Sequence, residues 1–188
     1  MHRQVIVTKG ADMPTSMGSG TGITAEFREV MSQWASGVAV VTTTGQDRRS
    51  YGFTASSFTV VSLEPATVLV CLDRTAECAP AFGRSQWLAV SILGAGQREV
   101  ARRFARKGHD KFAETDIEPG RFGAPLVSGA IGTLECRTVR HLPVGDHMVL
   151  IAEVHAAGPC ESAVASGEGP LVYHRRAFHA LGLDVRAS

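Results

Sequence analysis

The sequence is poor in aromatic residues and has almost no excess of one charge, and these shortages exclude several classes of function. Aromatics make up 6% of its 188 residues, and the formal net charge is +1. So balanced a charge gives no electrostatic basis for binding nucleic acid or an anionic membrane. No apolar run reaches the roughly 18 residues of a membrane-spanning helix. The length and composition predict one ordinary globular domain with a core of its own.

Cysteine spacing gives no sign of a metal site. The four cysteines form no C-x-x-C pair, and no Cys/His cluster has the spacing of zinc ligands, so we expect no metal. The N-terminus lacks the apolar core of a signal peptide. These features predict a cytoplasmic protein with free thiols.

The common catalytic motifs are missing as well. There is no G-x-S-x-G elbow, no P-loop and no H-E-x-x-H pair. A G-x-G sequence occurs at 94–96, but Glu99 occupies the place of the third glycine of a dinucleotide fingerprint. We therefore expect neither a serine hydrolase nor a metal-dependent or Rossmann-type enzyme.

The chain divides into a short arm and one domain. Residues 1–23 end in a Gly/Ser/Thr-rich run and are expected to form a flexible N-terminal arm, with the domain spanning 24–188. A helix is predicted after Thr24 as its N-cap, with Gly37 as its stop. Its apolar residues recur at helical spacing: Phe27, Val30, Met31 and Trp34.

Most of the predicted strands follow one another without an intervening helix. A second helix is predicted over 97–107. Strands are predicted over 38–44, 56–63, 67–72, 87–93, 132–142, 147–157 and 170–174. This order favours an antiparallel barrel with a few flanking helices over repeated βαβ units.

The segment "YGFTASSFTVVSLEPATVLVCLDR" (51–74) begins with small and hydroxyl residues where strands usually carry bulky ones. One interpretation is a plain surface strand. The other is a surface that leaves room for a flat ligand, with backbone N–H groups and hydroxyls available to bind it.

Two further segments are candidates for a site. In "VGDHMV" (144–149), Gly145 and Asp146 suit a tight turn that would present His147 at the mouth of a long hairpin, although an ordinary edge histidine fits too. The basic run at 102–107 is either a solvated helix face or a source of phosphate contacts.

Taken in order, these segments resemble a known family. The elements G-F-T-A-S-S-F, S-L-x-P and G-D-H, between about Phe27 and Leu181, resemble the flavin reductases of two-component flavin-dependent monooxygenases. The reductase component of 4-hydroxyphenylacetate 3-monooxygenase is one such relative. The resemblance implies a mainly β fold, a split β-barrel of the FMN-binding, Greek-key type with flanking helices, which acts as a homodimer.

The resemblance also implies the ligands and the residues that hold them. The flavin would be FAD or FMN and the hydride donor NADH, or NADPH if Arg175 or Arg176 binds its extra phosphate. His147 is the expected catalytic residue, because it would lie beside the nicotinamide and histidine titrates near neutrality. The expected cofactor-binding residues are Gly52, Phe53, Thr54, Ala55, Ser56, Ser57, Cys71, Leu72, Asp73, Arg74, Glu77, Cys78, Arg106, His147 and Tyr173.

The implied function is an NAD(P)H:flavin oxidoreductase that supplies diffusible reduced flavin to a separate monooxygenase. The alternatives are a bound-flavin oxidoreductase with another acceptor and a non-enzymatic flavin- or haem-binding barrel. One departure concerns the phosphate: the family often has Ser or Thr where this chain reads "AEC" (76–78), and Glu77 would repel a phosphate there. The choice between FAD and FMN therefore stays open.

Overall fold

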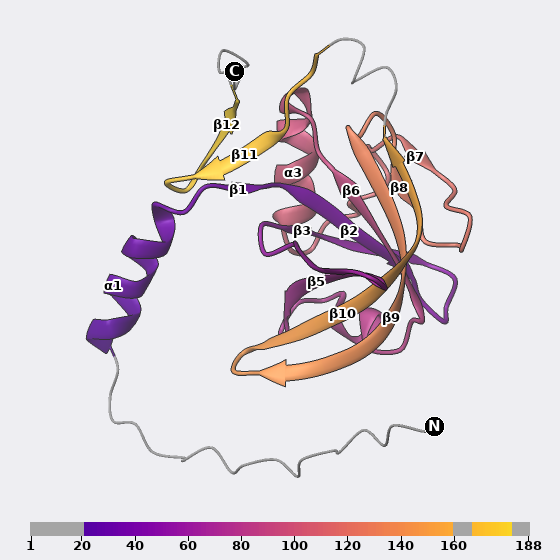
Figure 1. The fold of residues 1–188 in the computed structure, drawn as a ribbon, viewed down its shortest axis with the longest axis horizontal. Coiled ribbons are helices and arrows are strands. Elements are labelled where there is room, and N and C mark those ends of the chain that lie inside the picture. Colours follow the sequence, from indigo (N-terminus) through magenta and orange to yellow (C-terminus); the bar gives the residue numbers. More distant parts are fainter. Residues whose placement is uncertain (1–20, 160–166, 182–188) are drawn as a thin grey trace.

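A single curved sheet forms the body of the protein (Figure 1). The computed structural model describes residues 21–159 and 167–181. Seven antiparallel strands pair in the order β3-β2-β6-β9-β10-β5-β4. Their bounds are β2 (Ala39–Thr44), β3 (Ser50–Ala55), β4 (Thr59–Leu63), β5 (Ala66–Asp73), β6 (Trp87–Ile92), β9 (Gly132–Val144) and β10 (His147–Pro159). The expectation of a mainly β fold is confirmed.

The two edges of this sheet are neighbours along the chain. β3 and β4 lie at opposite ends of the strand order, and residues 56–58 alone connect them. The sheet must curl to bring these edges together, but no strand ladder joins β3 to β4 in the described chain. Hydrogen bonding therefore leaves the sheet open, and a closed barrel is not shown.

The curl encloses one apolar core, and a helix covers a second. The first core includes Val41, Leu72 and Leu150 together with Phe82 of α2 (Ala79–Phe82). The second lies under α3 (Arg98–Ala105), which inserts Ala101 and Phe104 against the start of the sheet. The short 3₁₀ helix η1 (Ala95–Gln97) leads into α3. The cores hold the neighbouring ends of β3, β5 and α3 at fixed positions.

Several short elements were not predicted from the sequence. They are β1 (Ser36–Gly37), β7 (Ile117–Glu118), β8 (Leu126–Val127), β12 (Ala177–Ala180) and the four-residue α2; the six-residue β3 of the main sheet was not predicted either. β1, β11 (Leu171–His174) and β12 form a small second sheet, and β7 pairs with β8. Elements this short carry too few residues for a period of apolar positions to be recognised.

The prediction of one strand over 56–63 is wrong in its bounds. β3 ends at Ala55 and β4 begins at Thr59, so the small residues Ser56 and Ser57 lie in the link between two strands. The hairpin is longer than predicted, because β9 and β10 run up to a two-residue turn, Gly145-Asp146. Gly145 has a positive φ of 58°, at the first turn position, where type II′ hairpin turns take glycine.

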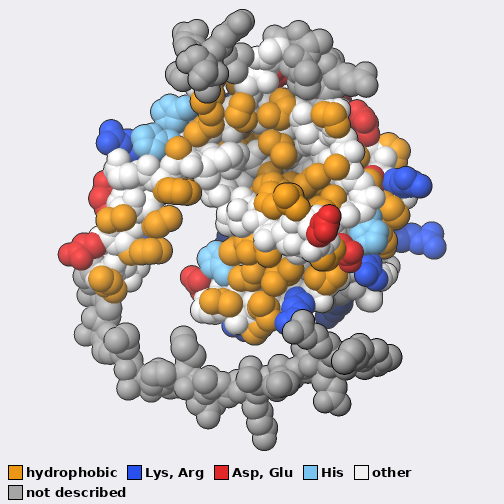
Figure 2. Space-filling model, in the orientation of Figure 1, with side chains coloured by type: hydrophobic (Ala, Val, Ile, Leu, Met, Phe, Trp, Pro, Cys, Tyr) orange, Lys and Arg blue, Asp and Glu red, His pale blue; other side chains and the backbone are white. Residues whose placement is uncertain are grey.

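The N-terminal helix stands away from the sheet (Figure 1). α1 (Thr21–Ser32) begins three residues before the predicted N-cap, so Thr24 lies inside it, and it ends at Ser32 rather than at Gly37, which lies in β1. Its contacts with the body are polar: the Arg175 amide donates to the Ser32 carbonyl, and Arg176 forms an ion pair with Glu29 at 3.4 Å. The predicted apolar stripe is present, but it faces solvent, as Figure 2 shows.

Candidate functional site

A cavity of about 350 Å³ opens where the link between β3 and β4 passes the ends of β5, β10 and α3. Its size lies within the range of small-molecule pockets. Twelve of the residues singled out from the sequence line it: Phe53, Thr54, Ala55, Ser56, Ser57, Cys71, Leu72, Asp73, Glu77, Cys78, Arg106 and His147. Segments far apart in the sequence thus meet around one hollow.

The hydroxyls of the small-residue stretch differ in their contacts and exposure. Thr54 Oγ1 donates to the Ala101 carbonyl of α3 at 2.6 Å, so this hydroxyl fastens β3 to the helix. Ser56 is exposed in the link between the strands. Of the three residues with hydroxyls in this stretch, Thr54, Ser56 and Ser57, Ser56 is the most exposed.

Ser57 extends the β4–β5 ladder with its side chain. Its Oγ accepts a hydrogen bond from the Cys71 amide at 3.0 Å and donates to the Cys71 carbonyl at 3.2 Å. Thr59 pairs with Leu69, so Ser57 stands opposite Cys71 in the same register. One hydroxyl satisfies both backbone groups at the point where a pair of strand residues would otherwise do so. The Ser57 hydroxyl thereby holds the backbone beside the cavity in place without a bulky side chain.

His147 is the first residue of β10 and stands at the rim of the cavity. It is the register partner of Asp73 at the end of β5, and its side chain is 43% exposed. The Asp146 carboxylate accepts a hydrogen bond from His147 Nδ1 at 2.7 Å. This hydrogen bond is the main cause that holds the pKa of Asp146 below its ordinary value. With Nδ1 engaged, Nε2 is the ring atom that a ligand can meet.

Asp73 is committed to the turn that follows β5. Its Oδ1 accepts hydrogen bonds from the Thr75 amide at 2.7 Å and the Thr75 hydroxyl at 2.8 Å. These two bonds lower the pKa of the Asp73 carboxyl, the backbone one most. Asp73 therefore shapes the loop that carries residues 74–78 along the cavity.

The end of the cavity that the loop after α3 forms carries cationic side chains. Arg106, Lys107 and Lys111 all line it, and Glu77 lies among them. Lys111 Nζ donates to the carbonyls of Gly52 (3.1 Å) and Phe104 (3.0 Å), which anchors the ammonium between β3 and α3. An ammonium has three N–H donors, so a third remains for a ligand.

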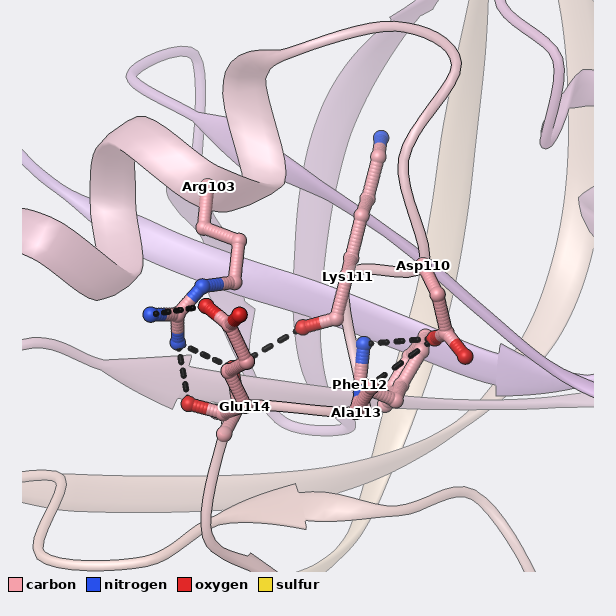
Figure 3. A network of polar contacts seen from close by, with 7 residues as sticks. Arg103, Asp110, Lys111, Phe112, Ala113 and Glu114 are labelled. Carbon is pink, nitrogen blue, oxygen red and sulfur yellow. Dashed lines mark hydrogen bonds and ion pairs between the residues drawn. The ribbon is translucent and has the colours of Figure 1, made fainter.

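A polar network fixes the loop that presents Lys111 (Figure 3). Asp110 Oδ1 accepts hydrogen bonds from the amides of Phe112 (3.1 Å) and Ala113 (3.2 Å). Arg103 on α3 pairs with Glu114 at 3.3 Å and also donates to its carbonyl. The Lys111 side chain extends away from this network, so the loop is held from one side while the lysine reaches the other.

A second cavity of about 440 Å³ adjoins the first. The two share the lining residues Thr54, Ser56, Ala105 and Arg106. Tyr173, Arg176 and Phe178 of the β11–β12 hairpin line the second one. Arg175 and Arg176 form the turn of this hairpin. Their backbone φ values are positive, 48° and 61°, which residues other than glycine rarely adopt. Two ligands could thus lie side by side.

Three of the residues singled out do not line the first cavity. Tyr173 lines the second one. Gly52 lies in β3, and a Cβ there would come within 2.8 Å of Phe104, so glycine is needed for packing. Arg74 is exposed beside the hairpin turn, where its amide donates to the Asp146 carbonyl at 3.0 Å.

The sequence reasoning missed several lining residues, of which Lys111 is the most informative. Lys107 belonged to the basic run noted in the sequence, but Lys111 stands alone in a loop and gave no signal. Within residues 21–159 and 167–181 no group of three His, Cys, Asp or Glu side chains could hold a metal ion. The helices in that part of the chain are too short or too polar to cross a membrane.

Comparison with known proteins places these features in a family. The "Flavin reductase like domain" family matches residues 31–182. The actinorhodin polyketide dimerase of Streptomyces coelicolor is 41% identical over 155 residues, 82% of this chain and 85% of that protein. The reductase component of the 4-nitrophenol 4-monooxygenase/4-nitrocatechol 2-monooxygenase of Rhodococcus opacus is 36% identical over 154 residues, 82% of this chain and 79% of that protein.

A solved structure has the same fold. The Streptomyces globisporus C-1027 NADH:FAD oxidoreductase SgcE6, in complex with NAD and FAD fragments, superposes with a TM-score of 0.79. It is 34% identical, and the match covers 87% of this chain and 95% of that one.

Proposed function

Because this chain belongs to the flavin reductase-like domain family, we propose that it is an NADH-dependent flavin reductase. It transfers a hydride from NADH to FAD or FMN and supplies the reduced flavin to a partner monooxygenase. The relative from Rhodococcus opacus, named as a monooxygenase reductase component, and the NADH:FAD oxidoreductase of similar fold support this function.

The single observation that carries the proposal is the pair of adjoining cavities over the Thr54–Ser57 stretch. The first combines a surface without bulky side chains with a cationic end, which suits a flat ring that bears a phosphate. The second, under the β11–β12 hairpin, is the place for the nicotinamide dinucleotide. Bound flavin supplies the ring that accepts the hydride. The protein's part would be to hold the flavin and the nicotinamide next to each other in the two adjoining cavities.

His147 is the proposed catalytic residue. It stands at the rim of the first cavity, and the bond from Nδ1 to Asp146 fixes the orientation of its ring. Nε2 would then hold the nicotinamide carboxamide or carry a proton close to the flavin ring. The other expected cofactor-binding residues that line the first cavity are proposed to contact the flavin, and Tyr173, which lines the second, the nicotinamide dinucleotide. Gly52 and Arg74 are proposed to shape the site.

A homodimer is the proposed assembly. Phe27, Val30 and Trp34 are each more than 60% exposed on or just after α1, and α1 makes polar contacts with the body through residues 175 and 176. An apolar stripe of this kind is usually buried against a partner, and a second copy is the occupant we propose. Light scattering that gave a mass of about 20 kDa, the mass of one chain, at working concentrations would contradict this.

The finer fold and the compartment are also proposals. The curled sheet, with both edges linked by residues 56–58, supports the split β-barrel of Greek-key type. Cys71, Cys78 and Cys136 carry free thiols, which supports a reducing cytoplasm.

The activity is tested by mixing the protein with NADH and an excess of free FAD or FMN under nitrogen and following NADH absorbance. Many turnovers per protein chain are expected. Bleaching of a single equivalent would indicate an oxidoreductase with permanently bound flavin, and no oxidation of NADH would refute the proposal. Replacing NADH with NADPH in the same assay compares the two donors through kcat/KM.

A further inference from the structure

Glu77 places a negative charge at the cationic end of the first cavity. It lies in the loop between β5 and α2, and it lines the cavity with Arg106, Lys107 and Lys111. Its two carboxylate oxygens lie 3.1 Å and 3.2 Å from the Gly108 amide, which donates to them. The carboxylate therefore links the loop after β5 to the loop after α3.

The Glu77 carboxylate repels different flavins to different extents, because their phosphates differ in charge. The terminal phosphate of FMN is a monoester and carries a charge of about −1.5 to −2 at neutral pH. In FAD the two phosphates form a pyrophosphate, in which each phosphorus carries a single negative charge, and riboflavin has no phosphate. Repulsion grows with the product of the charges and falls with distance. A carboxylate beside the first phosphate therefore opposes FMN most, because both charges of FMN lie on that phosphorus; it opposes FAD less, because one of the two charges lies on the next phosphorus, and riboflavin not at all.

We propose that Glu77 sets the flavin preference of this protein: its carboxylate discriminates against the terminal phosphate of FMN and so favours FAD. The inference rests on the proposed flavin reductase function. The three cations attract either phosphate, while Glu77 reduces the net charge of this end and holds the Gly108 amide. The preference thus depends on a single charge, that of Glu77.

The test compares Glu77→Gln with the unchanged protein. Glutamine keeps the size of the side chain and an oxygen that can accept from Gly108, but it has no charge. Dissociation constants for oxidised riboflavin, FMN and FAD are measured by calorimetry at low salt. We expect FMN to bind about five- to twentyfold more tightly to the variant, FAD less than about fivefold, and riboflavin without change.

A matched control removes a carboxylate elsewhere. Glu64 is exposed in the turn between β4 and β5, at the opposite end of β5 from Asp73, so Glu64→Gln changes the net charge equally without touching the cavity. It should leave all three affinities unchanged.

An FMN-to-riboflavin affinity ratio that is the same in Glu77→Gln and the unchanged protein would overturn the inference. An equal gain in FMN affinity in Glu64→Gln would also overturn it, because the effect would then come from the net charge of the protein and not from the position of Glu77. In both cases riboflavin binding and NADH turnover would leave the proposed function standing. If the unchanged protein binds no flavin at all, the proposed function fails and this inference fails with it.

Discussion

Replacing Ser57 with alanine should lower the stability of the flavin-free protein, although the residue lines the first cavity. The substitution removes the hydroxyl that bonds both the amide and the carbonyl of Cys71. The contact is partly buried, and no strand residue of β3 or β4 stands in its place. A partly buried amide left without a partner costs about 1–2 kcal/mol.

This loss of stability can be measured as a fall in the melting temperature, Tm. For a chain of this size, 1 kcal/mol shifts Tm by about 2–4 °C. Ser57→Ala should therefore melt about 2–8 °C below the unchanged protein, in the absence of flavin. Calorimetry or circular dichroism measures the shift directly.

Two further variants separate stability from ligand binding. Ser56→Ala removes a neighbouring hydroxyl that is exposed, and Tm should not change. Ser57→Thr keeps the hydroxyl and adds a methyl group beside the cavity, so stability should be retained while flavin affinity falls. The reasoning is refuted if Ser57→Ala melts with the unchanged protein, or if Ser56→Ala melts as low as Ser57→Ala.

Three other predictions follow from the site and from the exposed helix. His147→Ala should leave flavin binding nearly intact but slow anaerobic flavin reduction about tenfold to a thousandfold, for one lost contact of about 1.4–4 kcal/mol; unchanged stopped-flow rates would withdraw its catalytic role. Burial raises the pKa of Cys136 to about 12, so its thiol stays protonated near pH 9 and should resist alkylation, whereas Cys71 should react and be protected by flavin; peptide mapping that found Cys136 modified first would contradict this. Val30→Asp on α1 should lower the mass found by light scattering from two chains to one, and an unchanged dimer would place the interface elsewhere.

Local chemistry alone was enough for several features of the molecule. β-branched and apolar runs identified most strands of the sheet, because strand residues alternate between a core and the other face. Gly145 marked the hairpin turn, because a two-residue turn needs a positive φ at that position. The shortage of bulk at 54–57 correctly drew attention to the place where a cavity opens, since small side chains cannot fill it.

Other features depended on which segments meet in space. No period in the sequence reveals that Ser57 bonds Cys71 or that Lys111 reaches the Gly52 carbonyl of β3, because these contacts join residues 14 and 59 positions apart. The apolar stripe of α1 was visible in the sequence, but only the structure shows that these side chains are exposed and do not pack into the core of the same chain. Helix and turn signals arise from neighbours within a few residues, whereas the partner of a side chain is chosen by the packing of the whole domain.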